Sequence, residues 1–61
     1  MNILITYITV CLNSEKTITK CLKSIISQKN RYVEYIVIDG KSLDKTFNII
    51  KKYKGNIDYV I

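Results

Sequence analysis

Apolar and polar residues alternate along the chain in blocks that are typical of strands and helices taken in turn. Residues 3–10 are an almost unbroken run of β-branched and apolar side chains, as expected for a parallel strand covered on both faces. Residues 35–38 form a second apolar run, and residues 57–61 begin a third. These runs predict three strands, of which the first two are buried.

A helix is predicted between the first two runs. Apolar side chains recur there at the spacing of one helix face, at Ile18, Leu22, Ile25 and Ile26. Lysines occupy the opposite side, at Lys16, Lys20 and Lys23. Asn13 or Ser14 is expected to cap the start, because such side chains accept hydrogen bonds from the first free backbone N–H groups. The helix is therefore expected to bury one face and expose the other.

A second helix is predicted before the third run. Its apolar stripe consists of Leu43, Phe47, Ile50 and Tyr53. Ser42 is a suitable cap for its start. Gly55 stands where a residue in the left-handed conformation would end the helix. The second helix is thus expected to span most of the residues between the second and third strands.

The order β-α-β-α-β predicts an α/β fold. Each crossover is long enough for a right-handed parallel connection, so we expect three parallel strands in the order third–second–first. Two helices leave one sheet face and at least one edge poorly covered, which intact domains avoid. Residues 1–61 are therefore expected to be the opening part of an incomplete domain.

Ten basic and five acidic residues give the chain a formal net charge of +5. Phosphorylated ligands, nucleic acid and anionic lipid are all compatible with this charge. The basic residues are dispersed, and the aromatic residues do not alternate with them as a base-stacking surface would require. No nucleic-acid partner is therefore expected. The lysine side of the first helix is interpreted as a solvated face, with a peripheral membrane contact as the alternative.

Several chemistries are not expected because the residues they need are missing. The chain has no histidine and two cysteines, Cys11 and Cys21, which argues against a structural zinc site and a histidine-based triad. The only glycines are Gly40 and Gly55, so neither G-x-G-x-x-G nor a P-loop is present. No apolar run approaches the ~18 residues of a membrane-spanning helix. Two reduced cysteines fit a reducing, cytoplasmic compartment.

The candidate chemistry lies where the apolar runs end. Asp39 follows the second run, at the carboxyl end of a buried strand, where open α/β sheets bind ligands. Its carboxylate either accepts hydrogen bonds from a nucleobase amide or a ribose hydroxyl, or only organises the turn. Thr9, Cys11 and Asn13 stand at the end of the first run, each as a ligand contact or as a strand end or helix cap.

Three segments resemble the family 2 glycosyltransferases. Residues 8–18, Ile-Thr-Val-Cys-Leu-Asn-Ser-Glu-Lys-Thr-Ile, resemble the family's opening motif of a strand, a Y-N or similar pair and a first helix. Residues 24–28, Ser-Ile-Ile-Ser-Gln, are similar to the S-[IV]-x-x-Q end of that helix. Residues 34–46 resemble the E-Y-I-V-I-D-G-G-S-T-D-G-T signature of a branch associated with bacterial cell-surface polysaccharide synthesis. The similarity spans essentially the whole chain.

This resemblance implies the amino-terminal half of a three-layer, Rossmann-like GT-A domain that binds a nucleotide-sugar, most often a UDP-sugar. Carried over residue by residue, it assigns nucleotide binding to Thr9, Cys11, Asn13 and Asp39. Leu12 stands where many members have tyrosine, and Gly40 stands where many have a second aspartate credited with reading uracil. Lys41 and Lys45 replace frequent glycines and add positive charge near the expected diphosphate.

The family's metal-binding D-x-D motif and its catalytic base lie downstream of these motifs, and this chain contains no D-x-D. No catalytic or metal-binding residue is therefore assigned; both are expected beyond Ile61. The intact enzyme is expected to use a divalent cation, manganese or magnesium.

The resemblance implies transfer of a sugar to a glycan or lipid-linked acceptor, in the cytoplasm or at the inner face of the membrane. Residues 1–61 alone are expected to be inactive, because the metal ligands and the base are missing. The alternative is a non-catalytic α/β module with the same fold that serves nucleotide binding or assembly.

Overall fold

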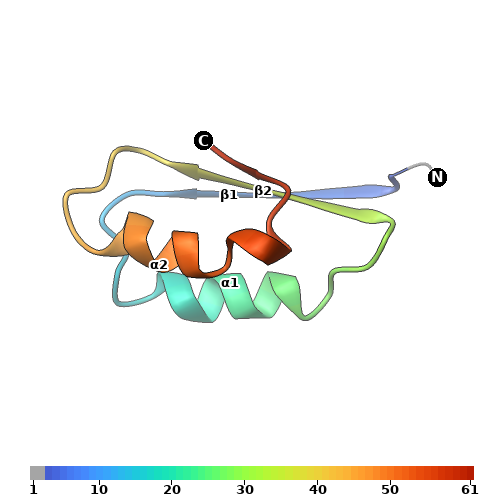
Figure 1. Ribbon diagram of the computed structural model, residues 1–61, viewed down its shortest axis with the longest axis horizontal. Helices are drawn as coiled ribbons and strands as arrows, with labels where there is room; N and C mark the ends of the chain where they lie inside the picture. The colour runs from blue at the N-terminus through green and yellow to red at the C-terminus, as the bar shows by residue number, and fades with distance from the viewer. Residues whose placement is uncertain (1–2) are drawn as a thin grey trace.

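The computed structural model describes residues 3–61, in which a three-stranded sheet carries both helices on one face (Figure 1). The elements in chain order are β1 (Ile5–Cys11), α1 (Ile18–Ile26), β2 (Val33–Asp39), α2 (Thr46–Lys52), the short 3-10 helix η1 (Lys54–Asn56) and β3 (Tyr59–Val60). The predicted α/β class and the predicted alternation of strands and helices are confirmed. No helix within residues 3–61 is both long and apolar enough to span a membrane.

The sheet is parallel throughout, with β2 in the middle. β1 pairs with β2 over its full length, from Ile5 opposite Val33 to Cys11 opposite Asp39. β3 pairs with the other edge of β2, where Tyr59 lies opposite Ile36. The predicted strand order third–second–first is therefore confirmed. Both crossovers advance in the same direction across the sheet, and two connections of the same hand place their helices on the same face.

The core lies between the sheet and the helix layer. Alternate residues of β2 point towards the helices, and Val33, Tyr35 and Val37 are buried there. Leu22 of α1 and Ile50 of α2 are fully buried against them. Burial of each such side chain contributes about 1.5–3 kcal/mol, so this layer is the main source of stability.

The opposite face of the sheet is bare within the described residues. Most of its side chains are apolar, and they come from all three strands: Ile8, Val10, Ile36, Ile38 and Tyr59. The polar pair Thr6 and Glu34 lies at the amino end of the same face. Val10 is 72% exposed. The prediction that the first strand is covered on both faces is wrong for residues 3–61, because both helices pack on the same side. The prediction of one poorly covered face is confirmed.

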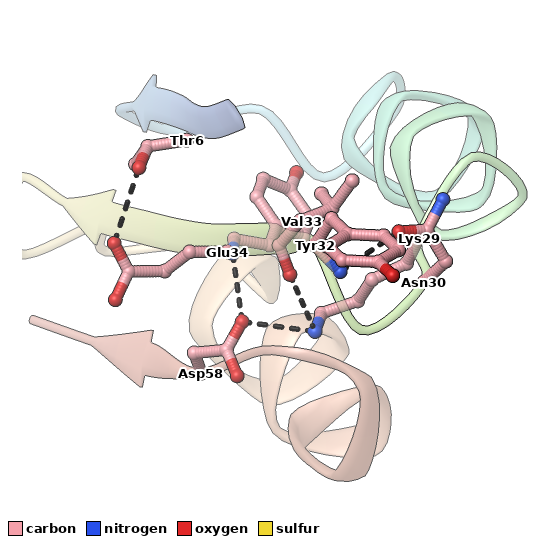
Figure 2. A network of polar contacts seen from close by, with 8 residues as sticks. Thr6, Lys29, Asn30, Tyr32, Val33, Glu34 and Asp58 are labelled. Atoms are coloured by element: carbon pink, nitrogen blue, oxygen red, sulfur yellow. Dashed lines mark hydrogen bonds and ion pairs between the residues drawn. The ribbon is translucent and has the colours of Figure 1, made fainter. Parts of the chain in front are cut away.

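The start of β3 is attached to β2 through Asp58 (Figure 2). The Asp58 carboxylate accepts the N–H of Tyr35 at 2.8 Å and lies 2.9 Å from the ammonium group of Lys29. Lys29 also donates to the carbonyl of Val33 at 3.3 Å. The hydrogen bond from Tyr35, aided by Lys29, holds the pKa of Asp58 below its ordinary value. This junction lies towards the amino end of β2, away from the loops that leave its carboxyl end.

Both helices begin later than predicted. α1 begins at Ile18, after Thr17, so the expected cap at Asn13 or Ser14 is wrong. α2 begins at Thr46, so Ser42 is not its cap. Leu43, placed in the apolar stripe of the second helix, lies in the preceding loop and is 94% exposed. The side chains of Asn13 and Ser42 instead make contacts between the segments that precede the two helices, and the Ser14 hydroxyl donates to the carbonyl of Leu12 at 3.1 Å.

The end of the second helix also differs from prediction. Gly55 lies within η1, and its φ is not positive. The chain tightens into a 3-10 turn, in which Asn56 donates to the carbonyl of Tyr53 at 2.9 Å and Ile57 donates to that of Lys54 at 3.2 Å. These short-range bonds satisfy free carbonyls at the helix end without a left-handed residue.

Candidate functional site

Two loops leave the carboxyl edge of the sheet side by side. The first loop (residues 12–17) follows β1, and the second loop (residues 40–45) follows β2 (Figure 1). Because Cys11 pairs with Asp39 at the ends of the two strands, the loops start from adjacent points. The N–H of Gly40 donates to the carbonyl of Cys11 at 2.9 Å and extends the pairing by one bond.

Ser42 connects Asp39 to the first loop. The Asp39 carboxylate accepts the N–H of Ser42 at 3.3 Å and, through its other oxygen, the Ser42 hydroxyl. The same hydroxyl oxygen accepts the N–H of Asn13 at 2.8 Å. The Asn13 side-chain carbonyl in turn accepts the N–H of Leu43 at 2.8 Å. Asn13 and Asp39, predicted separately as site residues, are therefore joined through one serine.

A second connection runs from Asp44 to the start of the first helix. One Asp44 oxygen accepts the N–H of Thr46 at 2.9 Å and also the Thr46 hydroxyl. The other accepts the N–H of Glu15, across the gap between the loops, at 3.2 Å. The Thr46 hydroxyl oxygen accepts the N–H of Ser14 at 2.7 Å. One carboxylate therefore holds the first residue of α2 and the approach to α1.

These contacts set the charge state of the loops. The hydrogen bond from the Thr46 hydroxyl, with those from backbone N–H groups, holds the pKa of Asp44 below its ordinary value. Burial raises the pKa of the Cys11 thiol, and the Asp39 carboxylate raises it further. The lowered pKa favours the ionised form of the Asp44 carboxyl, and the raised pKa favours the protonated form of the Cys11 thiol.

Backbone strain is concentrated in the same loops. Asn13 has φ 49° and Lys41 has φ 63°, both in the left-handed region. Asparagine tolerates this conformation well, whereas a lysine there carries a steric cost of roughly 1 kcal/mol. This accounts physically for a glycine at the position of Lys41 in the motif that the sequence resembles.

The structure places the four predicted nucleotide-binding residues at different depths. Asn13 and Asp39 lie in the loop network, and Asn13 is exposed. Cys11 is 7% exposed, with its sulfur 4.0 Å from an Asp39 oxygen. Thr9 lies farther back along β1, and its hydroxyl is 2.8 Å from the hydroxyl of the buried Tyr35. The structure thus brings Cys11, Asn13 and Asp39 together and leaves Thr9 beneath the helices.

Asp39 organises the turn, since both of its oxygens contact Ser42. This leaves room for a ligand, because an ionised carboxylate has about four acceptor positions. Sequence reasoning missed the roles of Asp44 and Thr46. An aspartate two residues before a helix start is the signal that could have identified a cap, but its contact with Glu15 depends on the fold.

The loop residues do not fit a metal site. Within residues 3–61, no group of three or more histidine, cysteine or carboxylate side chains is arranged to hold a metal ion. The Asp39 and Asp44 carboxylates point at hydroxyl and N–H groups of the loops rather than converging on one point. We therefore assign no metal to these residues.

Comparison with known proteins identifies the family. Residues 6–61 match the family model described as Glycosyl transferase family 2, and the chain belongs to this family. It is 49% identical over 43 residues to a dolichyl N-acetyl-alpha-D-glucosaminyl phosphate 3-beta-D-2,3-diacetamido-2,3-dideoxy-beta-D-glucuronosyltransferase of Methanococcus voltae. The matched region covers 66% of this chain and 13% of that protein.

A second relative covers more of the chain. Over 56 residues this chain is 34% identical to a poly-beta-1,6-N-acetyl-D-glucosamine synthase of Staphylococcus aureus (strain COL). The matched region covers 92% of this chain and 14% of that protein. The chain therefore spans about one-seventh of the length of these relatives. No solved structure is significantly similar to it.

The strain at Lys41 leads to a prediction with a matched control. Lys41→Gly should raise the free energy of unfolding by about 0.5–1 kcal/mol, because glycine adopts a positive φ without steric cost. Lys45→Gly removes the same charge from the same loop at a residue with φ −81°. It should lower the free energy of unfolding by about 0.4–1 kcal/mol, through the greater freedom of the unfolded chain. Equilibrium urea unfolding measures the free energy of unfolding of both variants. If both variants changed it in the same direction, the backbone strain at Lys41 would be contradicted.

Proposed function

We propose that this chain is the donor-binding part of a glycosyltransferase that takes its sugar from a nucleotide-sugar. Family membership supports the reaction class. The observation that carries the proposal is the joining of the two loops through Ser42, which holds Asn13 and Asp39 together at the carboxyl edge of the sheet. Ligands of open α/β sheets bind at this edge.

Each loop residue has a role in this proposal. Asp39 accepts a hydrogen bond from the base or the ribose through an acceptor position that Ser42 leaves free. Asn13 offers its side-chain NH₂, because its carbonyl oxygen is occupied by Leu43. Lys41 and Lys45 are exposed in the second loop and attract the diphosphate. Cys11 lines the floor of the site from the end of β1, whereas Thr9 lies farther back beneath the helices and is assigned no direct contact.

The donor and acceptor are proposed by class. A UDP-sugar is the donor, and a glycan or lipid-linked acceptor receives the sugar. The names of the two relatives, a polysaccharide synthase and a transferase named for a dolichyl-linked sugar phosphate, support this choice. We assign the chain to the branch whose signature residues 34–46 resemble, which is associated with surface polysaccharide synthesis. The reaction takes place in the cytoplasm, at the inner face of the membrane.

We further propose that a longer protein supplies the remaining machinery. The bare apolar face of the sheet supports this, because an intact domain would cover it. The catalytic base that deprotonates the acceptor hydroxyl, and the ligands of a manganese or magnesium ion, then come from residues outside this chain. Such an ion would neutralise the departing diphosphate.

Asp39→Asn tests the nucleotide contact. The change keeps the size of the side chain but removes its charge, so UDP affinity should fall by about 1.5–3 kcal/mol, the value of a charge-assisted hydrogen bond. NMR titration of the chain with UDP measures it. Asp58→Asn is the control, because it alters a carboxylate that also accepts a backbone N–H but lies away from the loops. Unchanged affinity in a folded Asp39→Asn variant, or an equal loss in Asp58→Asn, would contradict the nucleotide contact.

The 61-residue chain should not transfer sugar by itself. None of its carboxylates is assigned to deprotonate an acceptor, and UDP binding should be weak because the bare sheet leaves the loops poorly supported. The measurement is turnover of UDP-sugars with manganese or magnesium present. Turnover by a monodisperse preparation of this chain would show that the catalytic machinery lies within these residues.

A further inference from the structure

Asp44 has a position that no nucleotide-binding assignment explains. It follows the second loop's turn, and its two oxygens serve different loops: one holds Thr46 at the start of α2, and the other holds the N–H of Glu15 in the first loop. The sequence separation across this second contact is 29 residues. A cap within one helix needs no such contact, so the carboxylate fixes one loop relative to the other.

Thr46 completes the connection. Thr46 is fully buried, which is uncommon for a polar residue. The hydroxyl donates to Asp44 and accepts the N–H of Ser14 at 2.7 Å. Two successive N–H groups of the first loop, from Ser14 and Glu15, are therefore held by the Thr46 hydroxyl at the start of α2 and by the Asp44 carboxylate of the second loop. We call Asp44 and Thr46 the loop latch.

The loop latch is placed to control the candidate site without touching the ligand. Asn13 immediately precedes the latched N–H groups, and Asp39 stands at the base of the second loop. Any change in the separation of the loops moves Asn13 relative to Asp39. The latch also occupies the Ser14 and Glu15 N–H groups, so the phosphates of a donor cannot use them.

We propose that Asp44 is a positioning residue for the nucleotide, which acts by holding the first loop, and with it Asn13, at a set distance from Asp39. This inference rests on the proposed function, because it takes the two loops to bind the donor. Asp44 itself contacts no part of the ligand. Its effect on affinity passes through Thr46 and the first-loop N–H groups.

The test compares two aspartates that make the same kind of bond. Asp44 and Asp58 both accept a backbone N–H, and both have a lowered pKa, but Asp58 lies at the other end of β2. The variants are Asp44→Asn and Asp58→Asn. Thr46→Val removes the hydroxyl at nearly constant volume, and Thr46→Ser keeps it. Each variant is titrated with UDP while the ¹⁵N–¹H resonances of Ser14 and Glu15 are followed.

Asp44→Asn should shift the Glu15 amide resonance and raise the UDP dissociation constant by up to roughly tenfold. The free energy of one charge-assisted hydrogen bond sets this upper limit, because the lost bond orders the first loop and does not touch the ligand. Thr46→Val should shift the Ser14 amide and weaken UDP similarly, and Thr46→Ser should restore both. Asp58→Asn should lower stability and leave the UDP dissociation constant unchanged.

Two results would overturn the positioning role. One is an Asp44→Asn variant whose Glu15 amide does not move, or moves without loss of affinity. The other is an equal loss of affinity in Asp58→Asn, which would reduce the effect to general stability. Failure of the proposed function has a different signature: the unaltered chain would show no response to UDP, while Asp44→Asn still shifted Glu15.

Discussion

The in-register parallel pairing of β1 with β2 is the constraint on which the rest of the structure depends. Cys11 lies opposite Asp39, so both strands end at the same level and both loops start from the same edge. A shift of one residue would reverse the faces of the side chains and place Tyr35 on the bare side of the sheet. The buried layer beneath the helices and the candidate site therefore depend on the same register.

The loops are ordered mainly by polar contacts. Asp39 and Asp44 each accept hydrogen bonds through both carboxylate oxygens. The hydroxyl oxygens of Ser42 and Thr46 accept backbone N–H groups of the first loop. Such bonds largely replace bonds to water in the unfolded chain, so they specify geometry more than they supply stability. Stability comes from the face of the sheet that the two helices cover. This stability offsets the steric cost of the loops, in which Asn13 and Lys41 adopt the left-handed conformation.

The sequence predicted the features that depend on local patterns. The apolar runs identified the three strands, and crossover length with handedness led to their parallel order. The helix starts were predicted wrongly because Asn13 and Ser42 satisfy groups in the opposite loop, about 30 residues away, rather than their own helices. Asp39 and Asn13 were identified from the ends of the two apolar runs, and the family resemblance assigned nucleotide binding to both. The role of Asp44 depends on a contact that no local pattern contains.

The most direct measurement is an NMR pH titration of the Glu15 amide in a Glu15→Gln background, which removes that residue's own carboxyl and keeps its backbone N–H. The structure predicts that this amide reports the ionisation of Asp44 across the two loops. Its midpoint should lie below the ordinary aspartate value of 3.8, because Thr46 and the backbone stabilise the charged form. The response should disappear when Asp44→Asn is added. An amide that does not titrate, or that titrates equally without Asp44, would contradict the connection between the loops.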